Sequence, residues 1–178
     1  MIASNWQSRL VLLARAGDRE ALEDLLSSTQ TKLLAYISRV VGSTAADDVL
    51  QDVLLQICRK LKWLRDPELF LPWSYRIASR ECFRMIRRDR RLCEEVLGIE
   101  EAEVKAPVEA ERQLFLDIPE LLEYVSPASR AVLHLHYCED LPLYDIAAIL
   151  ELDEGTIKSR LSYGLRSLRK HLIRKETI

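Results

Sequence analysis

The chain has 178 residues, of which 48% are hydrophobic and only five are glycine, a composition typical of a folded protein and not of a disordered one. Its formal net charge is -2, its four cysteines show no close pairing, and no apolar run approaches the length that spans a bilayer. Charged residues at 9, 15 and 18 also interrupt any apolar stretch that could serve as a signal peptide. We therefore expect a soluble, cytoplasmic protein with one ordinary domain or two small ones.

The charge is distributed unevenly along the chain. Residues 76–91 hold seven arginines against two acids, and residues 158–175 hold seven lysines or arginines and no acid. Between these basic segments, residues 93–117 hold eight acids against two bases. Two basic segments separated by an acidic one indicate a protein that binds a polyanion at two places.

The first part of the chain shows apolar residues at helical spacing. Gly17 and Gly42 are natural helix ends, and Asp18 is a natural N-cap. A second helix starting at Asp18 carries its apolar residues only as far as Leu26, and the pattern resumes in a third. We expect four helices here, over residues 6–16, 18–26, 31–41 and 45–61.

The fourth expected helix carries a polar patch opposite its apolar face, formed by Asp47, Asp48, Gln51 and Asp52. Acids in a first turn are often only charges that favour the helix dipole. The alternative is an acidic patch that docks a basic helix of a partner. The residues alone leave both interpretations open.

An arginine-rich helix is expected over residues 73–90, after a loop bracketed by Asp66-Pro67 and Pro72. Its arginines recur every three or four residues and form one cationic stripe. Aromatic residues lie within the helix or just before it: Trp63, Phe70, Trp73, Tyr75 and Phe83. Arginines interleaved with aromatics suit single-stranded nucleic acid, whose bases stack on rings. For Trp73 and Ile77 we favour the alternative, a place in the core.

The acidic segment 93–117 is the expected linker, because it contains Gly98 and Pro107 and has weak periodicity. Beyond it, Ser126-Pro127 is a good start for a helix that runs through Tyr137. No alternating apolar pattern is long enough for a strand. The sequence therefore predicts an all-α protein with a helical domain over 1–92, an acidic linker over 93–117 and a second helical domain over 118–178.

The last third of the chain has the pattern of a helix-turn-helix. A short apolar helix pattern around residues 146–150 is followed by a polar break at 151–155 and by a second helix with a basic face. Five residues near the start of this second helix can reach base edges: Lys158, Ser159, Ser162, Tyr163 and Arg166. Others are expected to meet phosphates: Arg160, Arg169, Lys170 and Lys175. A merely solvated helix face is the alternative, and the uniform sign of the charge counts against it.

Catalysis and metal binding find little support in the sequence. On a helix, His134 and Cys138 share a face while His136 points nearly opposite, so the three cannot bind one ion. There is no glycine loop that would cradle a phosphate and no convincing nucleophile with its base. We therefore expect no enzyme activity, no metal, no cofactor and no small-molecule substrate.

Several segments resemble bacterial sigma factors of the extracytoplasmic-function group. Residues 155–161 resemble the recognition-helix signature of the group, and residues 145–147 resemble the triplet before it. Residues 46–53 are similar to the motif that binds core RNA polymerase, and residues 73–78 resemble the start of the promoter-melting helix. Gly17-Asp18 with Ala21 matches the usual opening.

The resemblance implies a two-domain initiation factor that directs core RNA polymerase to promoters. Asp48, Gln51 and Asp52 would bind the polymerase. The melted downstream promoter element would meet Trp73, Arg76, Arg80, Arg84, Arg87 and Arg88. The upstream element would be read in the major groove by Thr156, Lys158, Ser159, Arg160, Ser162, Tyr163 and Arg166. The acidic linker would thread the channel that later carries RNA, and an anti-sigma factor, often membrane-anchored, would hold the protein inactive.

The chain departs from the group at positions that bear on promoter choice. After Ile77-Ala78 the group usually has Arg-Asn and an Asp four residues later, whereas Ser79, Arg80 and Arg84 stand here. In the recognition helix, Tyr163 and Leu165 replace basic residues. The promoter sequence therefore does not follow from the resemblance.

Two other functions remain open on the sequence. A sigma-like decoy would only bind an anti-sigma factor and would not need a basic recognition face. A one-component helix-turn-helix regulator would bind closed duplex DNA alone and would have no use for the patch of Asp48, Gln51 and Asp52.

Overall fold

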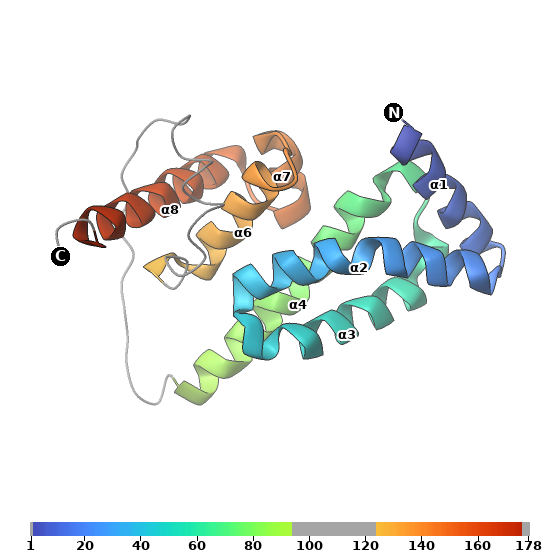
Figure 1. The fold of residues 1–178 in the computed structure, drawn as a ribbon, viewed down its shortest axis with the longest axis horizontal. Coiled ribbons are helices and arrows are strands. Elements are labelled where there is room, and N and C mark those ends of the chain that lie inside the picture. The colour runs from blue at the N-terminus through green and yellow to red at the C-terminus, as the bar shows by residue number, and fades with distance from the viewer. Residues whose placement is uncertain (1, 94–123, 176–178) are drawn as a thin grey trace. The chain divides into compact units, whose positions relative to one another are not determined.

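The computed structural model describes residues 2–93 and 124–175, which fold into two compact helical units (Figure 1). The first unit contains α1 (Ile2–Arg15), α2 (Arg19–Val41), α3 (Ser43–Lys60), the 3-10 helices η1 (Leu61–Trp63) and η2 (Pro67–Leu69), and α4 (Phe70–Cys93). The second contains α6 (Pro127–Tyr137), α7 (Leu143–Leu150) and α8 (Glu154–Lys175). No strand occurs in the described residues, and the expected all-α fold with two helical units is confirmed.

The domain boundaries predicted at residues 92 and 118 stay predictions. The expected linker, 93–117, lies outside the described residues except for Cys93, the last residue of α4. The first residues of the predicted second domain also lie outside them.

Residues 19–41 form one helix, so the prediction of two separate helices was wrong. Asp18 caps α2 as expected, by accepting a hydrogen bond of 3.1 Å from the Ala21 N–H. The apolar pattern weakens around Ser28 and Thr29, but both hydroxyls donate to the Leu25 carbonyl, at 2.9 and 2.8 Å. These bonds satisfy the polar side chains within the helix, and α2 continues to its end at Gly42.

The helix α4 begins at Phe70, three residues before the predicted start at Trp73. Pro72 therefore lies inside the first turn and not in the loop. A proline is tolerated there, because the first N–H groups of a helix have no partner within the helix. In the preceding η2, the Asp66 side chain accepts a hydrogen bond of 3.0 Å from the Glu68 N–H.

A buried network joins α2 to α4 in the first unit. The rings of Tyr36 and Tyr75 meet edge to face, with centroids 5.3 Å apart. Ser79 donates to the Tyr75 carbonyl at 2.7 Å, so its oxygen accepts from the Tyr36 hydroxyl, also at 2.7 Å. Burial raises the pKa of the Tyr36 phenol above its ordinary value and raises the pKa of the Cys82 thiol to about 12. Ser79, a departure from the group pattern, is thus a core residue.

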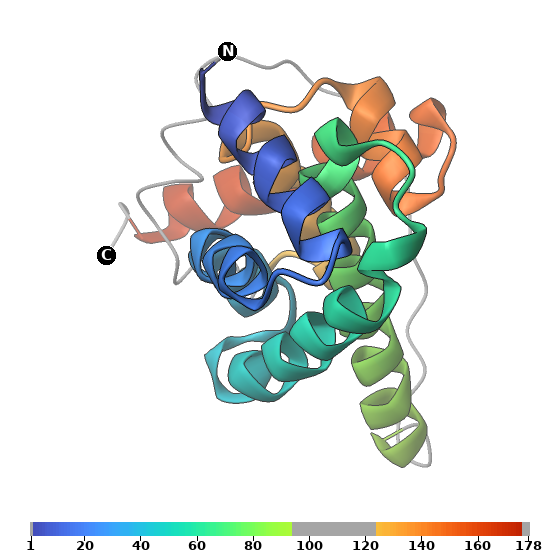
Figure 2. The same ribbon diagram turned by 90° about the vertical axis from the view of Figure 1, so that its right-hand side faces the viewer.

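The remaining elements of the first unit are α1, α3, η1 and η2. Figure 1 shows α2 and α3 as an antiparallel pair joined at Gly42, whose φ of 91° suits glycine. The helix α1 packs on η1 and η2, the segment between α3 and α4 (Figure 2). Each helix buries one stripe of apolar side chains and leaves its other side exposed.

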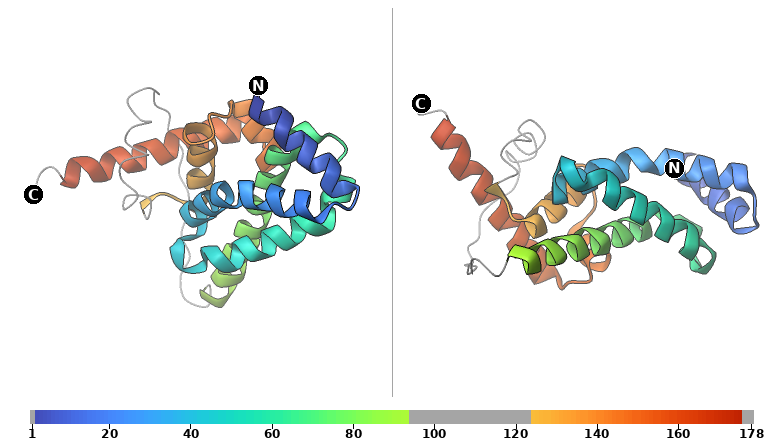
Figure 3. Two further views of the ribbon diagram at one scale, coloured as in Figure 1. Left: turned by 45° about the vertical axis from the view of Figure 1, so that its right-hand side comes forward. Right: turned by 90° about the horizontal axis from the view of Figure 1, so that it is seen from below.

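The second unit is a three-helix arrangement in which α6, α7 and α8 all contact one another (Figure 3). The contact between α6 and α8 is close at Gly164. A Cβ placed there would lie 2.8 Å from Leu133 Cδ1 and 3.1 Å from Ser129 Cβ. Only a residue without a side chain lets α8 approach α6 to this distance.

The turn between α7 and α8 is shorter than the predicted break at 151–155. Glu151 ends α7 in the left-handed conformation, with φ of 58°, and the Leu152 N–H donates to the Ala147 carbonyl at 3.0 Å. Asp153 then caps the next helix, so Gly155 lies in the first turn of α8. The two helices are joined by residues 151–153, as in a helix-turn-helix.

Cys58, Cys82 and Cys138 form no disulfide within the described part of the chain. Within residues 2–93 and 124–175, none of the helices has both the length and the apolar character that a membrane crossing requires.

We predict that Gly164→Ala destabilises the second unit by about 1 kcal/mol, because crowding against Leu133 and Ser129 outweighs the better helix propensity of alanine. Faster hydrogen exchange of the α6 and α8 amides in the full chain would report this loss. Ser159→Ala, on the exposed side of the same helix, is the control and should leave these rates unchanged or lower them. Unchanged exchange in the Gly164 variant would contradict the prediction.

Candidate polymerase and DNA interfaces

The predicted polymerase contacts lie together on the exposed side of α3. Asp48, Gln51 and Asp52 are three and four residues apart, a spacing that places side chains on one helix face. The opposite side of α3 is buried, through Ala46, Val49, Leu50, Val53 and Ile57. Burial of that stripe directs the three polar side chains outward.

Leu55 extends this polar face and was missed in the sequence. Leu55 is 47% exposed and lies three residues after Asp52 and four after Gln51. The signal was present, because Leu55 falls outside the spacing of the buried Val53 and Ile57. An exposed leucine is ordinary by itself, but this one adjoins a patch of candidate binding residues. We call Asp48, Gln51, Asp52 and Leu55 the α3 face.

The arginine stripe of α4 divides into two parts by exposure. Arg80, Arg84, Arg87 and Arg88 are exposed, whereas Arg76 and Trp73 are half-buried. The Trp73 ring packs against Phe70, with centroids 6.1 Å apart. The cationic surface is therefore concentrated after the first two turns of the helix.

Two of the aromatics considered for base stacking are core residues. The start of α4 packs into the first unit and buries Ile77 almost completely, as favoured above. Phe70 and Tyr75 are also fully buried. Their rings cannot stack on a base, so that part of the interpretation was wrong. Trp63 is the opposite case: it is 65% exposed, and the Lys62 ammonium lies 4.4 Å from its ring centroid.

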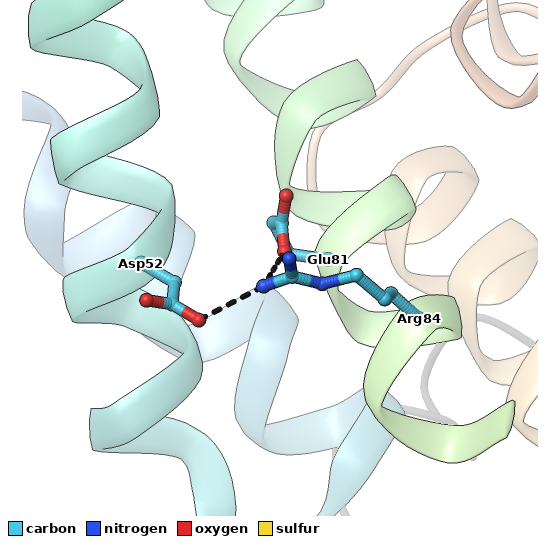
Figure 4. A network of polar contacts seen from close by, with 3 residues as sticks. All are labelled: Asp52, Glu81 and Arg84. Atoms are coloured by element: carbon cyan, nitrogen blue, oxygen red, sulfur yellow. Dashed lines mark hydrogen bonds and ion pairs between the residues drawn. The ribbon is translucent and has the colours of Figure 1, made fainter. Parts of the chain in front are cut away.

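One ion-pair network connects the α3 face with the arginine stripe. Arg84 Nη2 lies 3.0 Å from Asp52 Oδ2 and 2.5 Å from Glu81 Oε2 (Figure 4). Asp52 was predicted to bind polymerase and Arg84 to bind DNA. The structure brings these two side chains into contact across the α3–α4 pair.

The predicted recognition residues of α8 differ in exposure. Lys158, Ser159 and Tyr163 are exposed, Thr156, Arg160 and Arg166 are half-buried, and Ser162 is only 8% exposed. The apolar stripe is buried as expected, through Ile157, Leu161, Leu165 and Leu168. Ser162 thus has the least surface to offer to a base.

Two acids at the start of α8 engage predicted DNA contacts. Asp153 accepts hydrogen bonds from the Thr156 N–H at 2.8 Å and from the Thr156 hydroxyl at 2.6 Å. The hydroxyl proton of Thr156 is therefore used within the cap. Glu154 forms an exposed ion pair of 3.4 Å with Lys158, and an exposed i,i+4 pair of this kind is weak enough for DNA to displace.

The two histidines near the end of α6 are part of the packing and hydrogen bonding of the second unit. His134 is buried, and His136 Nδ1 donates to the Leu141 carbonyl at 3.0 Å. No group of three side chains suited to a metal ion occurs within the described part of the chain.

Comparison with known proteins identifies the family. Residues 25–92 match the family described as Sigma-70 region 2, and residues 121–170 match Sigma-70, region 4. Together these matches cover more than half of the chain. The extracytoplasmic-function RNA polymerase sigma factor SigW of Bacillus subtilis is 27% identical over 172 residues, which cover 89% of this chain and 92% of that relative. The chain belongs to the sigma factors of the extracytoplasmic-function group.

Solved structures of sigma factors share the fold of this one. The sigma factor RpoE of Bartonella quintana, solved with the anti-sigma factor NepR, superposes with a TM-score of 0.66 and 23% identity, covering 84% of this chain and 95% of that one. CnrH, solved with the cytosolic domain of CnrY, gives a TM-score of 0.67 and 21% identity, covering 95% and 98%. The function expected from the resemblance is confirmed: this sigma factor directs RNA polymerase to promoters.

The cap of the sigma factor's α8 gives a pH-dependent prediction. Hydrogen bonds from the Thr156 hydroxyl and N–H hold the pKa of Asp153 below its ordinary value. A lowered folded-state pKa means that the cap contributes fully above the ordinary aspartate pKa and is lost as pH falls through the lowered value. We predict that Thr156→Val raises the pKa of Asp153, measured by NMR titration of its carboxyl carbon. An unchanged titration curve would show that the hydroxyl does not act on this carboxylate.

Proposed function

We propose that this sigma factor acts through three helical surfaces. The α3 face binds core RNA polymerase, α4 binds the melted downstream promoter element, and α8 reads the upstream element in the major groove. The observation that carries the proposal is the structure of α8, whose apolar stripe is buried in a helix-turn-helix while Lys158, Ser159 and Tyr163 stay exposed.

At the upstream element, we assign base and phosphate contacts to side chains of α8. Lys158 and Arg166 are the strongest candidates for base contacts, because long basic side chains reach acceptor atoms of guanine. Arg160 is assigned to phosphates. The complete set of proposed residues is Thr156, Lys158, Ser159, Arg160, Ser162, Tyr163 and Arg166.

At the downstream element, we assign contacts with unpaired DNA to α4. Exposed arginines supply attraction to phosphates, and the half-buried Trp73 supplies an aromatic ring on the same helix. The proposed set is Trp73, Arg76, Arg80, Arg87 and Arg88. Arg84 was predicted from the sequence to join them, but its side chain pairs with Asp52 and Glu81, and it is left out of the proposed set for that reason. The mechanism is non-enzymatic: binding at two DNA elements stabilises the opened promoter, while the polymerase makes and breaks the bonds.

The proposal includes an anti-sigma factor as partner and the cytoplasm as the place of action. Support for the partner comes from the fold, which is shared with a sigma factor solved in complex with an anti-sigma factor. Support for the location comes from the function, because core polymerase and promoter DNA are cytoplasmic. A membrane anchor on the anti-sigma factor stays part of the proposal.

Reconstitution with core polymerase tests the function as a whole. The purified chain and core polymerase should produce transcripts from native promoters mapped after overexpression. A chain that co-purifies with core polymerase but starts no transcript would overturn the initiation role. A decoy would fail to co-purify, and a one-component regulator would shift promoter DNA equally well without polymerase.

We predict that Lys158→Ala or Arg166→Ala weakens promoter binding by the holoenzyme by about 1–3 kcal/mol and relaxes base preference at one position. Competition gel shifts against promoters with single base changes measure this effect. Lys170→Ala, at an exposed position later in α8, should weaken all sequences alike, as loss of a phosphate contact does. A uniform loss for Lys158→Ala would instead assign Lys158 to phosphate.

We predict that Leu55→Ala weakens the affinity for core polymerase, by about 1–2 kcal/mol if the side chain becomes buried in the complex. Surface-immobilised core polymerase and the full-length variant give the affinity directly. Leu12→Ala is the matched control, because Leu12 is a leucine of similar exposure, 55%, on a different helix, α1. Equal affinities for the two variants would remove Leu55 from the docking surface.

A further inference from the structure

The contact between α3 and α4 centres on a single guanidinium group. Arg84 Nη2 lies between two carboxylates, 3.0 Å from Asp52 Oδ2 and 2.5 Å from Glu81 Oε2. Figure 4 shows Asp52 reaching from α3 and the other two side chains from α4, with the second Asp52 oxygen directed away from Arg84. One nitrogen therefore bridges two helices whose bridging residues are 32 positions apart in the chain.

Exposure differs strongly among the three side chains. Those of Arg84 and Asp52 are 62% and 57% exposed, whereas that of Glu81 is only 13% exposed. A carboxylate removed from water needs a hydrogen-bonded or charged partner. The mostly buried Glu81 carboxylate therefore pairs with the guanidinium, and the guanidinium in turn pairs with one oxygen of the exposed Asp52 carboxylate.

The charge of the network makes Arg84 a poor ligand for DNA phosphate. Two carboxylates surround one guanidinium, so an approaching phosphate meets a group whose positive charge is already balanced. Arg87 and Arg88 lie on the next turn of the same helix and are exposed. Neither makes an ion pair with another described residue, and they are the better candidates for phosphate contacts.

We propose that Arg84 is a positioning residue of the polymerase-docking surface, which orients Asp52 on the α3 face, and that it is not a DNA contact. The inference rests on the proposed function, in which Asp52 binds core polymerase. With Oδ2 held by Arg84, Asp52 presents Oδ1 in a fixed direction to a basic side chain of the polymerase. Fixing the carboxylate before binding reduces the side-chain entropy that association would otherwise cost.

A double-mutant cycle on affinity for core polymerase tests this role. With Asp52 present, Arg84→Ala should weaken core affinity by about two- to fivefold, the range expected for an exposed ion pair. In the Asp52→Ala background, Arg84→Ala should cause no further loss. Arg84→Lys should restore part of the affinity, because lysine keeps the charge but not the planar fork.

A second arm separates docking from DNA binding. The salt dependence of promoter binding by the holoenzyme should be unchanged in Arg84→Ala, whereas Arg87→Ala should lower the slope by about one. Thermal unfolding of each full-length variant shows whether a lost affinity reflects a lost fold.

Four results would overturn the inference. Equal losses of core affinity for Arg84→Ala in both Asp52 backgrounds would mean that Arg84 acts on the polymerase independently of Asp52. A lower salt slope for Arg84→Ala, with unchanged core affinity, would return Arg84 to the DNA surface. Unchanged core affinity for Asp52→Ala would overturn the proposed docking role of Asp52 together with the inference. If Asp52→Ala weakens core affinity but Arg84→Ala does not, the inference alone is overturned and the docking role of Asp52 stands.

Discussion

The burial of one apolar stripe on each helix decides which polar side chains can reach a partner. In α3 the buried Val49, Val53 and Ile57 leave Asp48 and Asp52 on the outside. In α8 the buried Ile157, Leu161 and Leu165 do the same for the basic residues between them. A helix repeats every 3.6 residues, so the orientation that buries the apolar stripe also decides which residues face the solvent. The sigma factor therefore positions its candidate contacts by packing that lies on the other side of the same helices.

The basic segment of α4 offers fewer exposed, unbalanced arginines in the fold than its sequence indicates. Counted along the sequence, residues 76–91 form a continuous basic segment. In the fold, Arg84 is balanced by Asp52 and Glu81, and Arg76 is half-buried. The electrostatic attraction for DNA is thus concentrated in fewer side chains than the count of arginines indicates. Exposed charges separated by more than the Debye length, about 8 Å at physiological salt, are largely screened, so close ion pairs dominate.

Much of the fold could be predicted from local patterns. Gly17, Gly42 and Ser126 mark helix ends through the chemistry of caps and of positive φ, which depends on neighbouring residues only. The continuity of α2 was missed, because Ser28 and Thr29 look like a break until their hydroxyls are seen to bond the Leu25 carbonyl. The early start of α4 was missed because Pro72 was taken as a loop residue, although a proline fits the first turn of a helix.

The sequence predicted which helices carry the candidate site residues, but it did not predict which of these residues contact one another. Motif spacing placed Asp52 on α3 and Arg84 on α4, but nothing local indicates that residues 32 positions apart share an ion pair. The three departures from the group pattern illustrate the difference. Ser79 lies in the core, where its hydroxyl accepts a hydrogen bond from Tyr36. Arg84 pairs with two carboxylates. Of the three, Arg80 is the exposed change that stays in the set proposed to contact melted DNA. A sequence comparison treats these substitutions as one altered motif, whereas the fold separates a core serine, an arginine held between two carboxylates and an exposed arginine.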